Sequence, residues 1–172
     1  KANAGETTVN GTEEIVFTLN ASDLAGETIV VFEDLYRNNL EVTSHADIND
    51  KDQTIYLPKI GTTATDKEDD DKQLSPEKEI TITDEVAYEN LIPGKTYTVT
   101  GSLIVKETID PTTGLITDEH HVLKDADGKE VIVTKTFTPT KSSGKISLDF
   151  VIDASSLANR ELVVFEKVAQ HV

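Results

Sequence analysis

The chain has 172 residues, a formal net charge of −16 and no Cys, Met or Trp. Its length suffices for one domain and part of another, and the lack of cysteine excludes disulfides and thiolate metal sites. The negative charge argues against binding to nucleic acid or to an anionic membrane surface. No apolar run reaches the roughly 20 residues of a membrane span, and no signal-peptide pattern follows Lys1. We expect the sequence to be a segment of a longer protein.

An internal repeat supports this expectation. Residues 11–24 align without gaps with residues 144–157, an offset of 133, and the motif Val-Val-Phe-Glu ends at both Glu33 and Glu166. A period of this length is typical of tandem domains rather than of short stacked repeats.

The repeat also predicts where the modules divide. Residues 1–58 are expected to be the C-terminal part of one module, and residues 59–172 the next module without its last strand. Both modules are therefore expected to be truncated, with Pro58 at their boundary.

Alternating apolar residues predict strands along most of the chain. In chain order, they are Ile15, Phe17 and Leu19; residues 54–57; Ile60, Thr62 and Ala64; Ile80 and Ile82; Tyr97, Val99, Leu103 and Val105; Val131 and Val133; and Ile146, Leu148, Phe150 and Ile152. Many short strands at this spacing predict an all-β fold, an antiparallel β-sandwich of the immunoglobulin-like kind.

Turn signals separate these strands. They are Pro93-Gly94, residues 110–114, Asp127-Gly128 and residues 142–144. Asp127-Gly128 predicts a hairpin turn, and the acidic run 66–72 is expected to be a solvated loop. One helical turn is considered for residues 22–24 and for its copy at 155–157.

Several polar residues stand out by position, although each also has an ordinary explanation. Gln53 follows His45 by eight residues, with Asp47, Asp50 and Asp52 between them, and a polar turn before an edge strand would give the same pattern. Glu33 and Glu166 each close an apolar run, where a carboxylate is often simply the first exposed residue. Asp84 and Tyr88 follow Ile82 and are compatible with a strand that leaves for a turn.

Taken together, these motifs resemble the VaFE-type repeat domains of Gram-positive cell-surface adhesins. The resemblance rests on four stretches and covers essentially the whole chain: residues 60–66, residues 82–101, the two Val-Val-Phe-Glu motifs, and residues 45–54. It implies immunoglobulin-like modules in a stalk, each closed by an intramolecular ester bond between a threonine near its start and a glutamine near its end.

The resemblance also implies roles for single residues. Thr62 would form the ester in the second module, in preference to Thr63, because Thr62 shares a face with Ile60 and Ala64. Gln53 would be the acyl donor of the first module, and His45 would assist proton transfer. Glu33 and Glu166 would be the acid of each module, with Asp84 as carboxylate partner. His171 is not expected to replace His45, since it aligns with Asn38.

Such a bond requires activation of both groups. A base must take the threonine proton, and an acid must polarise the amide oxygen before ammonia leaves. Neighbouring buried Asp and Glu side chains would share one proton and supply that acid. The reaction occurs once per molecule, so the chain is not expected to be an enzyme, and it needs no cofactor or metal.

The order of the residues predicts how the bond would form. The first and last strands of an immunoglobulin-like module run parallel, and parallel strands need a connection of about a dozen residues or more. Only residues 54–61 separate Gln53 from Thr62, so an intrachain ester between them is expected to be excluded. We expect head-to-tail self-association by strand swapping, in addition to contacts with neighbouring repeats of the same chain.

Two other functions are considered. A ligand-binding or calcium-binding adhesin module is suggested by Asp47, Asn49, Asp50 and Asp52, although this run lacks the Gly and Glu of an EF-hand loop. An accessory domain of a secreted hydrolase is the other function, but the sequence contains no nucleophile motif in its favour. The resemblance implies an extracellular protein anchored to the cell wall, with its signal peptide and anchor outside this segment.

Overall fold

The computed structural model of the protein describes residues 10–171, which contain strands and no helix. In chain order, the strands are β1 (Thr28–Val30), β2 (Glu33–Arg37), β3 (Leu40–His45), β4 (Thr54–Tyr56), β5 (Lys59–Asp66), β6 (Ile80–Glu89), β7 (Tyr97–Val105), β8 (Thr108–Ile109), β9 (Ile116–Asp118), β10 (His121–Val122), β11 (Ile132–Phe137), β12 (Gly144–Ile152) and β13 (Leu162–Gln170). The expected all-β fold is confirmed.

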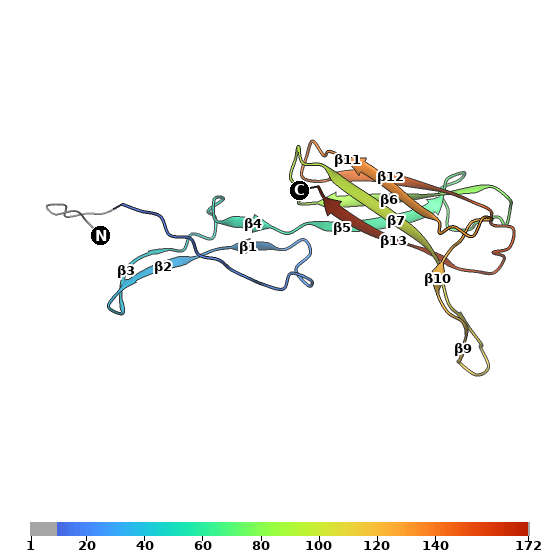
Figure 1. Ribbon diagram of the computed structural model, residues 1–172, viewed down its shortest axis with the longest axis horizontal. Coiled ribbons are helices and arrows are strands. Elements are labelled where there is room, and N and C mark those ends of the chain that lie inside the picture. The colour runs from blue at the N-terminus through green and yellow to red at the C-terminus, as the bar shows by residue number, and fades with distance from the viewer. Residues whose placement is uncertain (1–9, 172) are drawn as a thin grey trace.

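Strands β5 to β7 and β10 to β13 form a two-layer antiparallel sandwich (Figure 1). One sheet has the order β12-β6-β5. In the other, β13 pairs along the whole of β7, and β10 and β11 share the opposite edge of β7. Within the described residues, no strand pairs with the outer edge of β13 or of β5. The two open edges belong to opposite layers, and β13 lies near β5.

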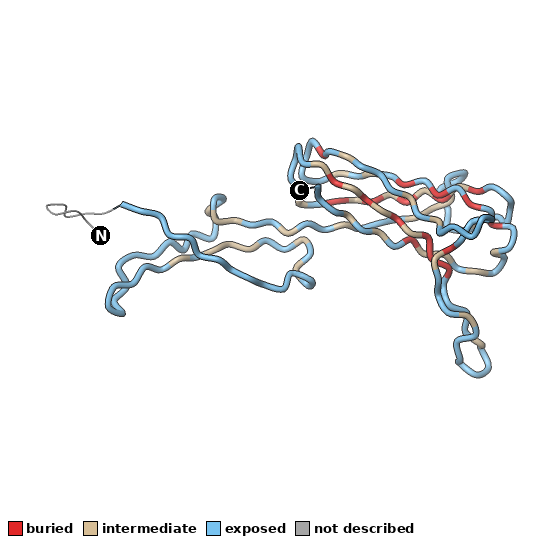
Figure 2. The backbone as a smooth tube through the Cα atoms, viewed as in Figure 1, coloured by how far each residue is buried: buried red, intermediate tan, exposed pale blue. Residues whose placement is uncertain are grey.

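The two sheets are held together by apolar side chains at alternate positions of the central strands. Phe150, Leu103 and Val86 are fully buried. Full burial of an apolar side chain of this size stabilises the fold by about 1.5–3 kcal/mol. The buried positions, drawn in red in Figure 2, are confined to the sandwich.

The N-terminal part is a long antiparallel ribbon in which β1 pairs with β4 and β2 pairs with β3 (Figure 1). Asn38 and Asn39 join β2 to β3 with φ values of 50° and 62°. Two positive φ angles are typical of the tight turn that matches strand twist, and Asn tolerates them well. The ribbon ends at Pro58, where the Asn90 side-chain amide donates to the carbonyl of Leu57 at 3.1 Å.

Two local predictions are wrong. Residues 15–19 alternate like a strand, yet no strand forms there, and Ile15 and Phe17 are 63% and 61% exposed. Their copies at 148 and 150 pair with β6, whereas residues 10–58 contain no counterpart of β6, so the apolar pattern has nothing to pair with. The expected helical turns at 22–24 and 155–157 are successive tight turns, with Leu157 donating to Ala154.

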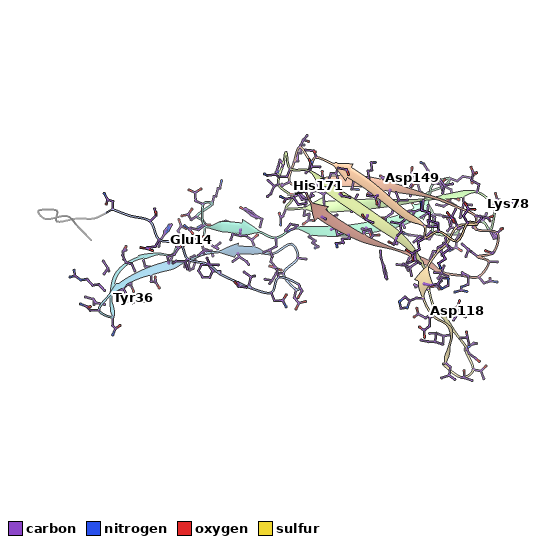
Figure 3. The ribbon with its side chains drawn as sticks, in the orientation of Figure 1. Glu14, Tyr36, Lys78, Asp118, Asp149 and His171 are labelled. Atoms are coloured by element: carbon purple, nitrogen blue, oxygen red, sulfur yellow. The ribbon has the colours of Figure 1, made fainter. Side chains whose placement is uncertain are left out.

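The turn predictions are confirmed. Gly128 adopts a φ of 78° and donates to Asp125 in the hairpin turn before Val131. In the acidic run 66–72, residues 67–72 form the expected exposed loop, whereas Asp66 is half-buried and is the last residue of β5. The turn at 110–114 closes a hairpin, β8–β9, that projects from the sandwich (Figure 1). The Arg160 side chain donates a hydrogen bond to Asp118 Oδ2 at 2.8 Å and so holds the base of this hairpin; Asp118 is labelled in Figure 3.

Candidate functional site

Thr62 lies in the edge strand β5. It is directly opposite Val86 of β6, whose side chain is fully buried, and directly paired residues share a sheet face. Thr63 faces the other way, opposite Glu85. The inner-face position expected for Thr62 is therefore observed. Its side chain is nevertheless exposed, because the groove beside β5 holds no strand within the described residues.

Asp84 is the most deeply buried polar residue of the sandwich, with no exposed surface. It lies on the central strand β6, between Ala64 of β5 and Leu148 of β12. Neither of its carboxylate oxygens receives a hydrogen bond from an N–H or O–H donor of the described residues. A buried acid without donors favours its protonated form, and burial raises the pKa of Asp84 above its ordinary value.

Glu166 reaches the same place from the opposite sheet. It lies on β13, opposite Gly101, and both Asp84 and the Thr62 hydroxyl are close enough to its carboxyl to shift its pKa. Burial first, and then the neighbouring Asp84 charge, raise the pKa of Glu166 to about 7. The Glu166 side chain acts on Asp84 in the other direction and lowers its pKa, although burial outweighs this effect. Burial and mutual proximity thus favour a single proton shared by the two carboxyls.

Lys72 is a further member of this site that the sequence did not indicate. Its ammonium group donates to the carbonyl of Ala64, the residue opposite Asp84, and its charge lowers the pKa of Asp84. Lys72 lies in the acidic run 66–72, which has the composition of a solvated loop. Only the folded loop brings the ammonium group back to β5.

The N-terminal ribbon brings together a second group of the predicted residues. Glu33 of β2 lies directly opposite His45 of β3, and their Oε2 and Nδ1 atoms are 3.9 Å apart. The other ring nitrogen of His45 lies 2.9 Å from Asp50 Oδ2. Asp50 was part of the spacing pattern but had no predicted role. It holds the imidazole from the side opposite Glu33.

Gln53 lies next to this group. Its backbone carbonyl accepts a hydrogen bond from the Val31 N–H at 3.0 Å, and Val31 precedes Glu33 by two residues. Gln53 and Thr62 are not brought together. The nine residue steps between them follow β4 and β5, which run on from one another (Figure 1). Extended chain rises about 3.3 Å per residue, so the two residues are separated by on the order of 30 Å.

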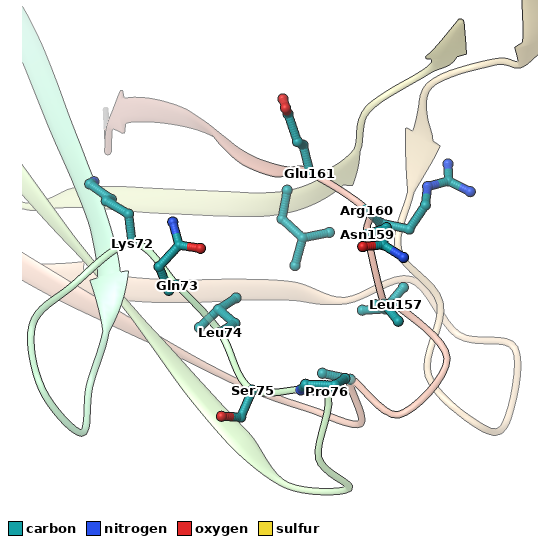
Figure 4. Close-up of a pocket in the computed structure, with 12 residues that line it drawn as sticks. Lys72, Gln73, Leu74, Ser75, Pro76, Leu157, Asn159, Arg160 and Glu161 are labelled. Carbon is teal, nitrogen blue, oxygen red and sulfur yellow. The ribbon is translucent and has the colours of Figure 1, made fainter. Parts of the chain in front are cut away.

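A groove runs along the open edge of β13. At one end it is lined by Ala64, Leu103 and Val164. It continues past Leu74 and Leu162 into the space between residues 72–76 and residues 157–162 (Figure 4). The part lined by Ala64, Leu103 and Val164 is mainly apolar, whereas the part beside Arg160 is more polar. No strand of the described residues pairs with the edge of β13 beside it, and an unpaired edge next to side-chain pockets is what strand addition requires.

The sequence profile of one family, the T-Q ester bond containing domain, matches residues 1–57 and again residues 58–172. The chain belongs to this family. The predicted resemblance to Thr–Gln ester-bond repeats is thus confirmed. Among curated proteins, none matches the chain.

Two further findings concern the alternatives. Residues 10–171 contain no cluster of three or more His, Asp or Glu side chains arranged to hold a metal ion. In the loop proposed for calcium, Asp47 and Asp50 instead accept backbone N–H groups of Asn49 and Asp52. No helix suited to crossing a membrane occurs in the part of the chain that the structure describes.

Proposed function

We propose that this chain is a structural stalk segment of a bacterial cell-surface adhesin, in which a Thr–Gln ester ties the first and last strands of each module. In a tension-bearing stalk such a bond would keep a module closed when its noncovalent contacts fail. The protein would act outside the cell, attached to the cell wall, and the bond would form once without an enzyme or cofactor.

The observation that carries this proposal is the complementarity of the two residue groups. The sandwich brings Thr62 and Asp84 close to Glu166, and the ribbon contains His45 and Gln53 beside Glu33. Glu33 and Glu166 are equivalent in the repeat. If Glu33 is superimposed on Glu166, the residue group of the ribbon and that of the sandwich would together make one complete ester-forming site.

The repeat also gives the register of this superposition. In the ribbon, His45 lies opposite Glu33, and the backbone carbonyl of Gln53 accepts a hydrogen bond from the Val31 N–H. With the repeat offset of 133 residues, Glu33 corresponds to Glu166 and Val31 corresponds to Val164. Both belong to the inner-facing series of β13, so His45 and Gln53 would enter the groove on the side of Thr62.

The same register places apolar residues of β4 in the remainder of the groove. Ile55 pairs with Ile29, and the repeat equivalent of Ile29 is Leu162. The Leu57 N–H donates to the backbone carbonyl of Glu27, and the equivalent of Glu27 is Arg160. Leu162 and Arg160 both line the groove, and Arg160 is labelled in Figure 4. Ile55 is 55% exposed in the ribbon, and it would become buried against Leu162.

The reaction follows from the states of these groups. Glu166, protonated below pH 7, would donate to the Gln53 amide oxygen and make its carbon electrophilic, while His45 would assist transfer of the Thr62 proton. Thr62 Oγ1 would bond to the Gln53 side-chain carbon, the carbon–nitrogen bond would break, and ammonia would leave with the proton. The product is an ester, shielded from water by the inserted strand.

In this 172-residue chain, the complementing strand would come from a second copy, because Gln53 and Thr62 of one chain lie far apart. Residues 45–57 of one molecule would complete the sandwich of the next, which gives head-to-tail covalent oligomers.

Denaturing electrophoresis at increasing protein concentration tests the proposal. We expect a ladder of covalent oligomers whose intact masses show the loss of one ammonia per bond. A chain that remains monomeric at every concentration, without loss of ammonia, would contradict the cross-linking function.

A further inference from the structure

Gly101 lies in direct contact with the site, although it has no chemistry of its own. It is the cross-strand partner of Glu166 on β7, and directly paired residues share a face, so any side chain at this position would point into the core beside Glu166. Its φ is not in the left-handed region. The backbone would therefore accept alanine, and the reason for glycine must be steric.

The space beside Gly101 is filled from the opposite sheet. A Cβ atom added here would lie 2.8 Å from both Leu148 Cδ1 and Phe150 Cζ, and 3.5 Å from Val164 Cγ1. Leu148 and Phe150 are 1% and 0% exposed. Both are surrounded by close-packed core, so neither can swing away to admit a methyl group.

Leu148 connects this space to the acidic pair. It is the direct cross-strand neighbour of Asp84 on β12, and its terminal carbon reaches across the sandwich to Gly101. Leu148 and Phe150 therefore form an apolar wall that starts beside Asp84 and ends at Gly101, the cross-strand partner of Glu166. A wall of this kind keeps water away from both carboxyls.

We propose that Gly101 is a positioning residue for the Asp84–Glu166 pair: its missing side chain lets Leu148 and Phe150 close the wall that dries the pair. This inference rests on the proposed function in that the pair acts as the acid of ester formation. The drying of the pair, however, can be measured without any ester.

The test compares Gly101→Ala with Gly144→Ala, both in a Gln53→Ala background that has no acyl donor. Gly144 is a matched control because a Cβ there would collide with the Tyr88 ring, four residues along β6 from Asp84. Carboxyl carbon NMR follows the titration of Glu166, with Glu166→Gln to assign its signal. We expect the pKa of Glu166 to fall from about 7 toward its ordinary 4.5 in Gly101→Ala and to stay near 7 in Gly144→Ala.

Equal pKa values of Glu166 in the parent and in Gly101→Ala, or an equal fall in both glycine variants, would overturn the inference. If Gly101→Ala does not fold, Leu148→Ala opens the same wall from the other sheet and should lower the pKa of Glu166. An unchanged pKa in that variant would also overturn it. Failure of the ester proposal would leave these titrations unaffected, so the two outcomes are separable.

Discussion

Thr62 and Thr63 are adjacent hydroxyl residues on opposite faces of β5, and only the Thr62 hydroxyl influences the pKa of Glu166. We predict that Thr62→Ala abolishes covalent oligomers on denaturing gels, whereas Thr63→Ala leaves their yield unchanged. Both substitutions remove one exposed hydroxyl from the same edge strand, so differences in folding should be small. Loss of cross-linking in Thr63→Ala alone would reassign the nucleophile.

The shared proton gives a second prediction at this scale. The pKa of Glu166 is about 7 in the folded chain and 4.5 ordinarily, so between these values the folded state binds a proton that the unfolded state releases. Stability therefore falls as pH rises through this window. We expect the melting temperature of the uncross-linked Gln53→Ala chain to decline from about pH 5, just above the ordinary pKa, to about pH 8, above the raised value of about 7.

Glu166→Gln should flatten this decline, because glutamine keeps the shape of the protonated acid without titrating. Glu161→Gln is the control: Glu161 is an exposed residue paired with Lys106, and its pKa is lowered rather than raised. The explanation fails if the decline persists in Glu166→Gln or disappears in Glu161→Gln.

Sequence patterns predicted individual residues of the site unevenly. Thr62 could be chosen over Thr63 from alternation alone, since strand periodicity fixes the face. The contact of Asp84 with Glu166 could not be derived from spacing, because it joins two sheets across the core. Lys72 and Gly101 were not predicted: one lies in a loop of ordinary acidic composition, and the other acts by having no side chain.

At the scale of secondary-structure elements, β4 is expected to bind through Ile55. Burial of an exposed isoleucine contributes about 1.5–3 kcal/mol, which is roughly a ten- to hundredfold change in affinity. We predict that Ile55→Ser weakens reversible self-association of the Thr62→Ala chain by about this factor in sedimentation velocity experiments.

Ile109→Ser is the matched control for this prediction. Ile109 is 52% exposed on the projecting β8–β9 hairpin, compared with 55% for Ile55, and it lies outside the groove at Leu162. Equal association of the two variants and the Thr62→Ala parent would show that β4 does not occupy the groove.

The strands themselves show the limits of pattern reasoning. Alternation predicted β6, β7 and β12 correctly, because their apolar faces meet in one core. The same alternation at residues 15–19 failed, although its copy forms β12. Hydrophobic periodicity specifies which face a strand would bury, but a strand forms only when a neighbouring backbone is available to pair with it.

At the scale of the whole molecule, the N-terminal part and the sandwich differ in how far their apolar side chains are buried. Phe17 and Ile15 are exposed, whereas their repeat equivalents Phe150 and Leu148 are fully buried. Large exposed apolar groups of this kind mark surfaces that bind other chains. Figure 2 shows the same contrast between the exposed ribbon and the buried interior of the sandwich.

Complementary variants test the central claim most directly. Thr62→Ala retains the ribbon that donates Gln53, and Gln53→Ala retains the sandwich that presents Thr62. We predict that neither variant forms a covalent product alone, and that their mixture gives a heterodimer lighter than the two chains by one ammonia, with Gln53 linked to Thr62 in its peptide map. A mixture that stays monomeric in denaturant, or an ester found within single wild-type chains, would contradict the account.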